Sequence, residues 1–276
     1  IIRYGKQMGL NIAPIKFRHS RSHYVLDKEN KTVYKGLYSV KTMNEQVAEE
    51  LYAIRDMDFK NFFDLLFYLK DNSSIKINQI NNLVKLNFFS EFGNIAYLLK
   101  CCELYDKYRK RKDLKIQEIV DLGIDGDVVA RFSQKVTAKK FVGVYMPEIL
   151  NIIAGDSNNY KEPSMGELLY YQDSCQGYID LRDQSYKYIV YVREIDTRYS
   201  PRLSVYTLSK GEEVQLKVQK DVFNKNKIED GDIIYLNQIA KKKKIRDGNG
   251  SFVELNGTIE WWTMDYKVID NIKKYK

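Results

Sequence analysis

The chain contains 276 residues, of which 44% are hydrophobic and 30% are charged, and its formal net charge is +8. This length suffices for about two globular domains, and the excess of lysine and arginine favours polyanionic partners such as nucleic acids. No apolar run approaches the roughly 20 residues of a membrane-spanning helix, so we expect no membrane partner. The cysteines, Cys101, Cys102 and Cys175, leave no paired disulfide framework. A reducing compartment, the cytoplasm, is therefore expected.

The first patterned segment, Tyr4–Asp27, combines a basic stretch with Met8-Gly9, a proline, and a serine ahead of an aromatic residue. The second, Thr32–Leu69, contains the good helix-forming run Glu45–Leu51 and then a stretch rich in aromatic and aliphatic residues.

The third segment, Ile80–Leu99, predicts two short helices joined by a tight turn. Apolar residues recur at helical spacing as far as Phe88, the run breaks at Phe92-Gly93-Asn94, and a second apolar face begins at Ile95. The sequence therefore predicts a helical hairpin.

Taken in order, these segments resemble the C-family replicative DNA polymerases of bacteria and phages, represented by the DNA polymerase III α subunit. The resemblance covers Tyr4–Leu99 in order and spacing. It implies a tandem helix-hairpin-helix region at residues 1–110 that binds duplex DNA, with the remainder of the polymerase as a partner. Because the chain begins with Ile1-Ile2 and no methionine, we expect a segment of a longer polypeptide.

One departure from the family pattern concerns the first hairpin, where Thr42, Met43 and Asn44 follow Lys41 in place of glycines. A helix-hairpin-helix presents backbone N–H groups to a phosphate, and glycine permits positive φ and a close approach. Thr42 or Asn44 still suits a helix cap, so we expect the fold to persist. Two interpretations remain: the hairpin is only structural, or Lys41, Thr42 and Asn44 contact the DNA backbone.

The segment 111–180 is predicted to be a helical connector. The stretches KIQEIVDLG and AKKFVGVYMPEILNIIAG suggest short helices, with turns at Gly123–Asp127 and Gly155–Asn159. Ser164–Leu181 partly resembles the connector helix of the polymerase family.

Within this connector, Gln117, Val120 and Leu122 resemble the short peptide with which many family members bind the sliding clamp. The resemblance implies a few apolar anchors that enter a pocket on the clamp. The alternative is that Ile116, Ile119 and Val120 are the buried face of a short helix.

From Tyr186 onward the hydrophobic period changes to two, and five short strands are predicted. A short helix and an Asp-Gly turn within Val222–Asp232 separate the third strand from the fourth. This order predicts an oligonucleotide-binding (OB) fold at residues 181–276, with a generic small barrel or sandwich as the alternative. The predicted fold class is therefore α+β, a helical region followed by a five-stranded barrel.

An OB fold binds its ligand across strands two and three, between the loops that join strands one to two and four to five. These loops are predicted at Asp196–Pro201 and Lys241–Gly250, and both are basic. We expect Tyr206 to stack on bases unless it packs in the core, and we expect the lysine run to bind DNA unless it is a solvated hairpin tip. The predicted DNA-binding residues of the barrel are Arg193, Arg198, Tyr199, Arg202, Tyr206, Lys241, Lys242, Lys243, Lys244 and Arg246.

The sequence contains no phosphate-binding Gly-x-x-x-x-Gly-Lys loop, no HExxH and no Gly-x-Ser-x-Gly motif. We therefore predict no catalytic residue, metal ligand or cofactor in this chain. The resemblance implies that the carboxylates that hold two Mg²⁺ ions for nucleotidyl transfer lie in a palm domain before Ile1.

Three hypotheses follow. The chain is the DNA-binding region of a C-family polymerase, which contacts the primer-template duplex and the single-stranded template. Alternatively, it is an RNA- or tRNA-binding OB module with a helical appendage, or a protein-interaction scaffold of a replication complex.

Overall fold

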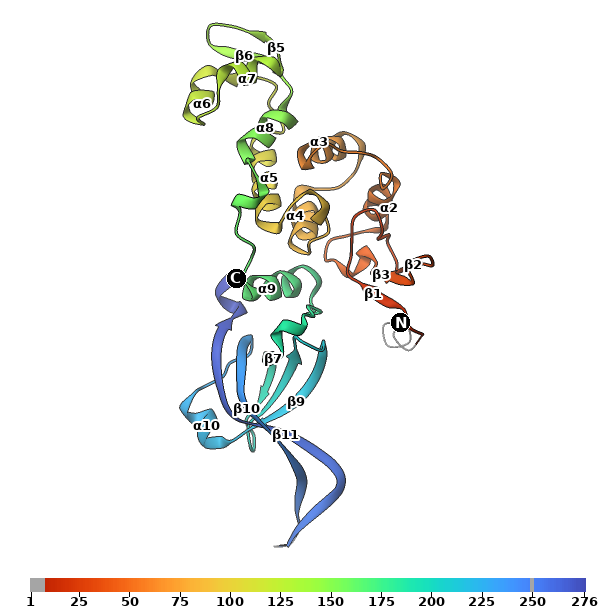
Figure 1. Ribbon diagram of the computed structural model, residues 1–276, viewed down its shortest axis with the longest axis vertical. Coiled ribbons are helices and arrows are strands. Elements are labelled where there is room, and N and C mark those ends of the chain that lie inside the picture. The colour runs from red at the N-terminus through yellow and green to blue at the C-terminus, as the bar shows by residue number, and fades with distance from the viewer. Residues whose placement is uncertain (1–7, 249–250) are drawn as a thin grey trace. The chain divides into compact units, whose positions relative to one another are not determined.

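The computed structural model describes residues 8–248 and 251–276, without the side chains of residues 243–259. The chain divides into two compact units, Ile1–Pro163 and Ser164–Lys276 (Figure 1). The first unit is mainly helical and the second contains a closed β-barrel, so the fold is α+β. In the described part of the chain, no helix is long and apolar enough to cross a membrane.

The first unit opens with a small sheet of three short strands, in the order β1 (Asn11–Ala13), β3 (Thr32–Tyr34) and β2 (Val25–Asp27). A 3₁₀ turn, η1 (Leu37–Ser39), follows it. A Cβ atom at Gly36 would lie 2.5 Å from the carbonyl oxygen of Ser22, so the chain can pass here only as glycine. Residues 4–7, which begin the first predicted pattern, lie outside the described residues.

The main helices of this unit are α2 (Glu45–Ala53), α3 (Phe62–Asn72), α4 (Ile77–Lys85) and α5 (Ile95–Tyr108). An asparagine side chain caps the N-terminus of three of them by accepting a backbone N–H bond. These caps are Asn44 for α2, Asn61 for α3 and Asn94 for α5. Asparagine is among the best N-cap residues, which explains why each helix begins where it does.

The predicted helical hairpin over Ile80–Leu99 is confirmed, although its first helix ends earlier than the apolar pattern indicates. Asn87 has a positive φ of 59°. The N–H groups of Asn87 and Phe88 donate to the carbonyls of Val84 and Leu83 over 2.9 and 3.0 Å. These two bonds form a Schellman motif, which ends the helix before Phe88. The Phe88 side chain therefore belongs to the turn and not to the helix. A 3₁₀ turn, η2 (Ser90–Phe92), then leads to α5.

An aromatic cluster joins the hairpin to the rest of the helical core. The ring of Phe17 lies 5.9 Å from Phe88 and 5.4 Å from Phe89, and Phe62 lies 5.3 Å from Phe89. All four side chains are essentially buried. Cys101 and Cys102 on α5 are also buried, as is Cys175 in the second unit, and no disulfide bond joins these cysteines in the described residues.

After α5 the chain forms a small module, of which the sequence predicted the short helix in KIQEIVDLG but not the strands. It consists of β4 (Leu114–Lys115), α6 (Ile116–Asp121), α7 (Gly126–Arg131), β5 (Ser133–Val136) and β6 (Lys140–Val144). The predicted helix across AKKFVGVYMPEILNIIAG is correct only for α8 (Met146–Ala154), because Phe141 and the valines beside it pair with β5 in a sheet. A 3₁₀ turn, η3 (Ser157–Asn159), follows.

The second unit begins with α9 (Met165–Gln176) and a 3₁₀ turn, η4 (Gln184–Tyr186). The barrel strands are β7 (Ile189–Asp196), β8 (Arg202–Thr207), β9 (Glu212–Val218), β10 (Asp232–Gly248) and β11 (Ser251–Asn271). The described barrel closes in the order β10-β11-β9-β8-β7, with β9 and β11 parallel. A final 3₁₀ turn, η5 (Ile272–Tyr275), follows β11.

The helix α10 (Lys220–Lys225) lies between the third and fourth strands, as predicted. Its Val222 and Phe223 pack against the barrel core, which includes Val192, Leu216 and Ile234. A five-stranded closed barrel with a helix at this point is consistent with an OB fold.

The predicted loop at Lys241–Gly250 is wrong, because β10 and β11 stay paired as far as Gly248 and Ser251. The two strands form a long antiparallel ribbon with several register shifts (Figure 1). The lysine run is therefore strand and not a hairpin tip.

Candidate nucleic-acid interface

The hairpin between the 3₁₀ turn η1 and helix α2 contains a left-handed residue without glycine. Thr42 has a φ of 69°, the left-handed conformation that glycine normally supplies. The Nε2 atom of Gln79 on α4 donates to the Thr42 carbonyl over 2.7 Å, and the Oδ1 atom of Asn44 accepts from the N–H of Val47 over 2.9 Å. Thr42 thus replaces the turn glycine, and Asn44 caps the helix as the sequence suggested.

A polar hollow of about 370 Å³ lies beside this hairpin, lined in part by Thr42, Asn44 and Lys76. The first turn of α2 directs backbone N–H groups out of the helix end, and Lys41 is exposed nearby in sequence. Glu45 in the same turn adds a negative charge that opposes a phosphate. The hairpin can therefore accept a phosphate, but with less electrostatic support than a glycine-rich one.

On the barrel, a row of side chains crosses the outer face of four adjacent strands, β8, β9, β11 and β10. Arg202 on β8 lies opposite Lys217 on β9, and Lys217 lies opposite Trp262 on β11. The Lys217 ammonium lies 5.3 Å from the Trp262 ring centroid, and the Lys242 ammonium lies 4.6 Å from it. Glu260 neutralises one charge, since it accepts from Lys217 over 2.7 Å. We call Arg202, Lys217, Lys242 and Trp262 the basic row.

A second lysine–tryptophan pair lies on the opposite face of the ribbon. Lys241 lies opposite Trp261, and its ammonium is 4.7 Å from the ring centroid. Trp261 is 39% exposed, so part of its ring remains open to a stacking base. Aromatic rings flanked by lysines combine base stacking with phosphate attraction.

Other predicted arginines of the barrel are held by carboxylates. Arg193 forms an ion pair with Glu213. Arg198 pairs with both carboxylate oxygens of Asp196, at 3.1 and 3.0 Å, and this lowers the pKa of Asp196. Tyr199 is exposed in the loop beside it. Arg202 is exposed and forms no ion pair within the described part of the chain, so of these arginines it offers the most available charge.

The expected exposure of Tyr206 is contradicted. Its side chain is buried in a cluster with Leu169 of α9, Tyr191 and Ile272. Burial raises the pKa of Tyr206 to about 12. The helix α9 packs over this part of the outer face, which explains why Tyr206 belongs to the core and is not available to a base.

The other predicted residues of the run belong to strand β10: Lys243, Lys244 and Arg246. Their side chains are outside the described residues. Their contribution to DNA binding stays a prediction.

The three predicted clamp-binding residues lie on or next to α6. Gln117 is exposed and its amide donates to Asp121 over 2.9 Å, while Val120 is 62% and Leu122 36% exposed. Of the apolar residues in the alternative interpretation, Ile119 is buried but Val120 is not. Val120 and Leu122 are therefore open to a partner, and clamp binding stays a prediction.

The sequence interpretation missed Lys217, Trp261 and Trp262. A signal for them was present, because Asn249-Gly250 is a strong hairpin dipeptide between two alternating runs. Two paired strands on either side of this dipeptide would place the lysines before it opposite the tryptophans after it.

The described residues include no group of three or more His, Cys, Asp or Glu side chains that could hold a metal ion. No curated protein matches the chain. A family model described as the helix-hairpin-helix motif matches residues 9–95. The matched region runs from β1 through α4 and includes the Thr42 hairpin, and it is therefore similar to a helix-hairpin-helix motif.

Proposed function

We propose that this chain is a DNA-binding region of a C-family replicative DNA polymerase. Its helix-hairpin-helix region would bind the product duplex, and its barrel would bind the single-stranded template. One observation carries this proposal. The same chain contains a match to the helix-hairpin-helix motif at residues 9–95 and a five-stranded barrel with the basic row on its outer face.

The duplex contact rests on the first hairpin. Lys41 supplies a cation beside the capped start of α2, where backbone N–H groups attract an anion. Contacts of this kind bind phosphates and position the protein without reading the base sequence.

The single-strand contact rests on the basic row and on Trp261. Lys241 and Lys242 attract phosphates on either face of the ribbon, and Trp261 offers a partly open ring for a base. Because α9 covers Tyr206, the strand would cross the barrel near Arg202 and the ribbon.

The proposal assigns no catalytic residue to this chain. The carboxylates and Mg²⁺ ions of nucleotidyl transfer would belong to a palm domain outside it. Gln117, Val120 and Leu122 would contact a sliding clamp. The purified chain is therefore expected not to extend a primer.

A protein-interaction scaffold is the second candidate. The observation that favours it is the first hairpin itself, where Thr42 replaces a glycine and Glu45 opposes a phosphate. An RNA- or tRNA-binding module remains the other alternative for the barrel.

Fluorescence anisotropy with primed duplex, single-stranded DNA and tRNA, each at two salt concentrations, separates these functions. The proposal expects binding to both DNA forms in preference to tRNA. Preference for tRNA would favour the RNA-binding module, and no binding to any nucleic acid would favour the scaffold.

Variants then locate each contact. Replacing Lys241, Lys242, Lys243 and Lys244 with alanine should weaken single-strand binding and flatten its salt dependence, since each lost phosphate contact removes a slope of roughly 0.7. Lys41→Gln should affect duplex binding alone. An unchanged single-strand slope in the lysine variant would show that these lysines are only solvated surface.

A further inference from the structure

The module after α5 has the order and topology of a winged helix-turn-helix. Helix α5 precedes β4, helices α6 and α7 follow, and β5 and β6 form a hairpin, with the sheet in the order β4-β6-β5. Figure 1 shows the two short helices beside the β5–β6 hairpin. The turn between α6 and α7 is four residues long and contains Gly123 with a φ of 68°. Such a turn is typical of a helix-turn-helix.

Backbone hydrogen bonds fix the conformation of the turn between α6 and α7. The N–H groups of Gly123 and Ile124 donate to the carbonyls of Val120 and Ile119, over 2.9 and 3.1 Å, which ends α6 in a Schellman motif. Ile119 and Val129 are buried between the helices and the sheet.

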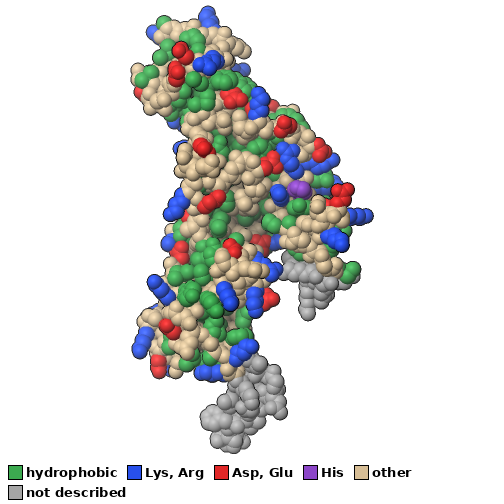
Figure 2. Space-filling view, in the orientation of Figure 1, with side chains coloured by type: hydrophobic (Ala, Val, Ile, Leu, Met, Phe, Trp, Pro, Cys, Tyr) green, Lys and Arg blue, Asp and Glu red, His purple; other side chains and the backbone are tan. Residues whose placement is uncertain are grey.

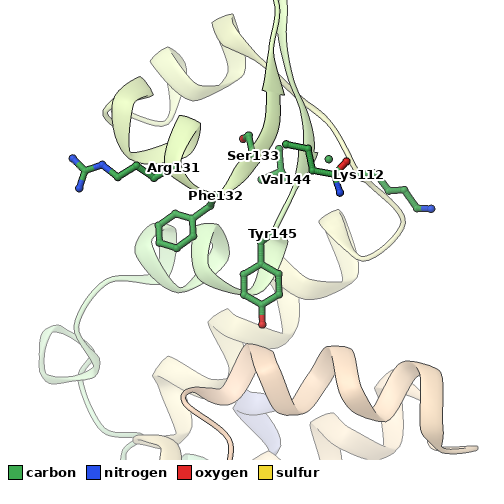
Figure 3. Close-up of a pocket in the computed structure, with 8 residues that line it drawn as sticks. Lys112, Arg131, Phe132, Ser133, Val144 and Tyr145 are labelled. Atoms are coloured by element: carbon green, nitrogen blue, oxygen red, sulfur yellow. The ribbon is translucent and has the colours of Figure 1, made fainter.

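Tyr145, the residue after β6, contacts the helices of the first unit. Figure 3 shows the Tyr145 side chain extending away from the β-strands and toward a neighbouring helix. Its hydroxyl donates to the Oδ1 atom of Asp64 on α3 over 2.8 Å. An open hollow of about 620 Å³ lies next to Tyr145 and includes Lys112 and Arg131.

The charges of the module are divided between its two sides. The start of the second helix, which contacts base edges in an ordinary helix-turn-helix, here carries Asp125 and Asp127, and Asp121 precedes the turn. All three are exposed. Carboxylates repel phosphates, so this side of the module does not suit DNA.

The strand side and the end of α5 carry the opposite charge. A hollow of about 470 Å³ is lined by Lys110, Arg111, Lys112, Lys115 and Lys140. The two acids beside it are already paired. Asp113 accepts from Lys140 over 2.5 Å, and Glu118 accepts from Arg111 over 2.6 Å.

Three exposed lysines therefore remain to attract an anion: Lys110, Lys112 and Lys115. None of them forms an ion pair with an acidic residue in the part of the chain that the structure describes. Their positions around one hollow concentrate positive charge where a phosphate backbone can approach.

We propose that this strand side, defined by Lys110, Lys112 and Lys115, is a further nucleic-acid contact that binds the phosphate backbone of duplex DNA without sequence preference. The winged module would thus bind through this hollow and not through its acidic turn. The residues that line the hollow include no aromatic side chain on which an unpaired base could stack, which favours a duplex over a single strand.

The test uses the full chain and the triple variant K110Q/K112Q/K115Q. Binding to a 30-base-pair duplex is measured by anisotropy over a series of salt concentrations. Each lost phosphate contact reduces the slope of log K against log salt by about 0.9, so the variant should lose a slope of about 2.7. Single-strand binding should keep its slope.

The matched control is K28Q/K31Q/K60Q, which removes three exposed lysines elsewhere in the first unit. It should leave the duplex slope nearly unchanged, and far-UV circular dichroism checks that both variants fold. A second control, D121N/D127N, should not weaken duplex binding.

An unchanged duplex slope in K110Q/K112Q/K115Q would overturn the proposal and leave an acidic protein as the partner of this surface. An equal loss in K28Q/K31Q/K60Q would also overturn it, because the effect would then be one of net charge. This proposal shares with the proposed function only the binding of duplex DNA. A chain that binds duplex in a Lys41-dependent way but not through this surface would contradict this proposal alone.

Discussion

Thr42→Gly tests the conclusion that a β-branched residue holds a glycine conformation at the first hairpin. A left-handed backbone costs an L-residue roughly 1–2 kcal/mol, and a β-branched side chain lies at the upper end of that range. Thr42 is exposed and its φ is 69°, so glycine would relieve this strain with little loss of packing.

Glycine also increases the freedom of the unfolded chain, which costs about 0.5–1 kcal/mol. The difference predicts a net stabilisation of about 1 kcal/mol, or an increase in Tm of about 2–4 °C for a unit of this size. The bond from Gln79 to the carbonyl of residue 42 involves only backbone at that position, so it should survive the substitution.

Urea and thermal unfolding of the full chain, followed by circular dichroism, measure this change. Two substitutions calibrate it. Asn87→Gly should destabilise the chain by about 0.5–1 kcal/mol, because asparagine tolerates its φ of 59° and little strain relief offsets the unfolded-state cost of glycine. Thr32→Gly, at a buried strand position without positive φ, should destabilise the chain. If Thr42→Gly destabilises the chain as Thr32→Gly does, the strain argument is refuted.

Three further predictions concern binding, attachment of the module and pH. Trp261→Ala should weaken single-stranded DNA binding by about 1–3 kcal/mol while Trp261→Phe retains most of it, as titration by anisotropy would show; equal losses would exclude stacking. Tyr145→Phe should cost about 0.5–1 kcal/mol in urea unfolding because Asp64 loses its donor, whereas an effect no larger than that of Tyr24→Phe would contradict this. Burial lowers the pKa of His19 below 6.5, so the stability from its neutral form is present above pH 6.5 and is lost as pH falls through the folded-state pKa. The urea midpoint should therefore drop less between pH 7.5 and 5.5 in His19→Gln than in the original chain.

Local chemistry explains the parts of the fold that the sequence predicted correctly. The asparagine before α5 and the apolar spacing around it identified the helical hairpin, because capping and periodicity are properties of short segments. The alternation after Tyr186 identified the barrel strands for the same reason. The helix after the third strand was also predicted correctly, because the Asp-Gly turn that follows it separates it from the fourth strand.

The errors arose where distant segments decide the outcome. Tyr206 is buried because α9 packs over its strand, and nothing within β8 reveals that cover. The lysine run was interpreted as a loop because an OB fold has a loop between its fourth and fifth strands, but here the run lies in strand β10, which pairs with β11 along the ribbon. The strand β6 was missed because its short apolar run fits a helix as well as a sheet.

The buried cysteines give the chain a chemical reporter for each unit. Cys101 and Cys102 lie within the first unit and Cys175 within the second, and all three are 2% exposed or less. Burial raises the pKa of Cys101 to about 12, so its thiolate is scarce while the fold is closed. Alkylation must then wait for the surrounding structure to open, and its rate at each cysteine follows the opening equilibrium of that unit. Mass spectrometry of the labelled peptides can therefore compare the opening free energies of the two units in one sample, without an introduced probe.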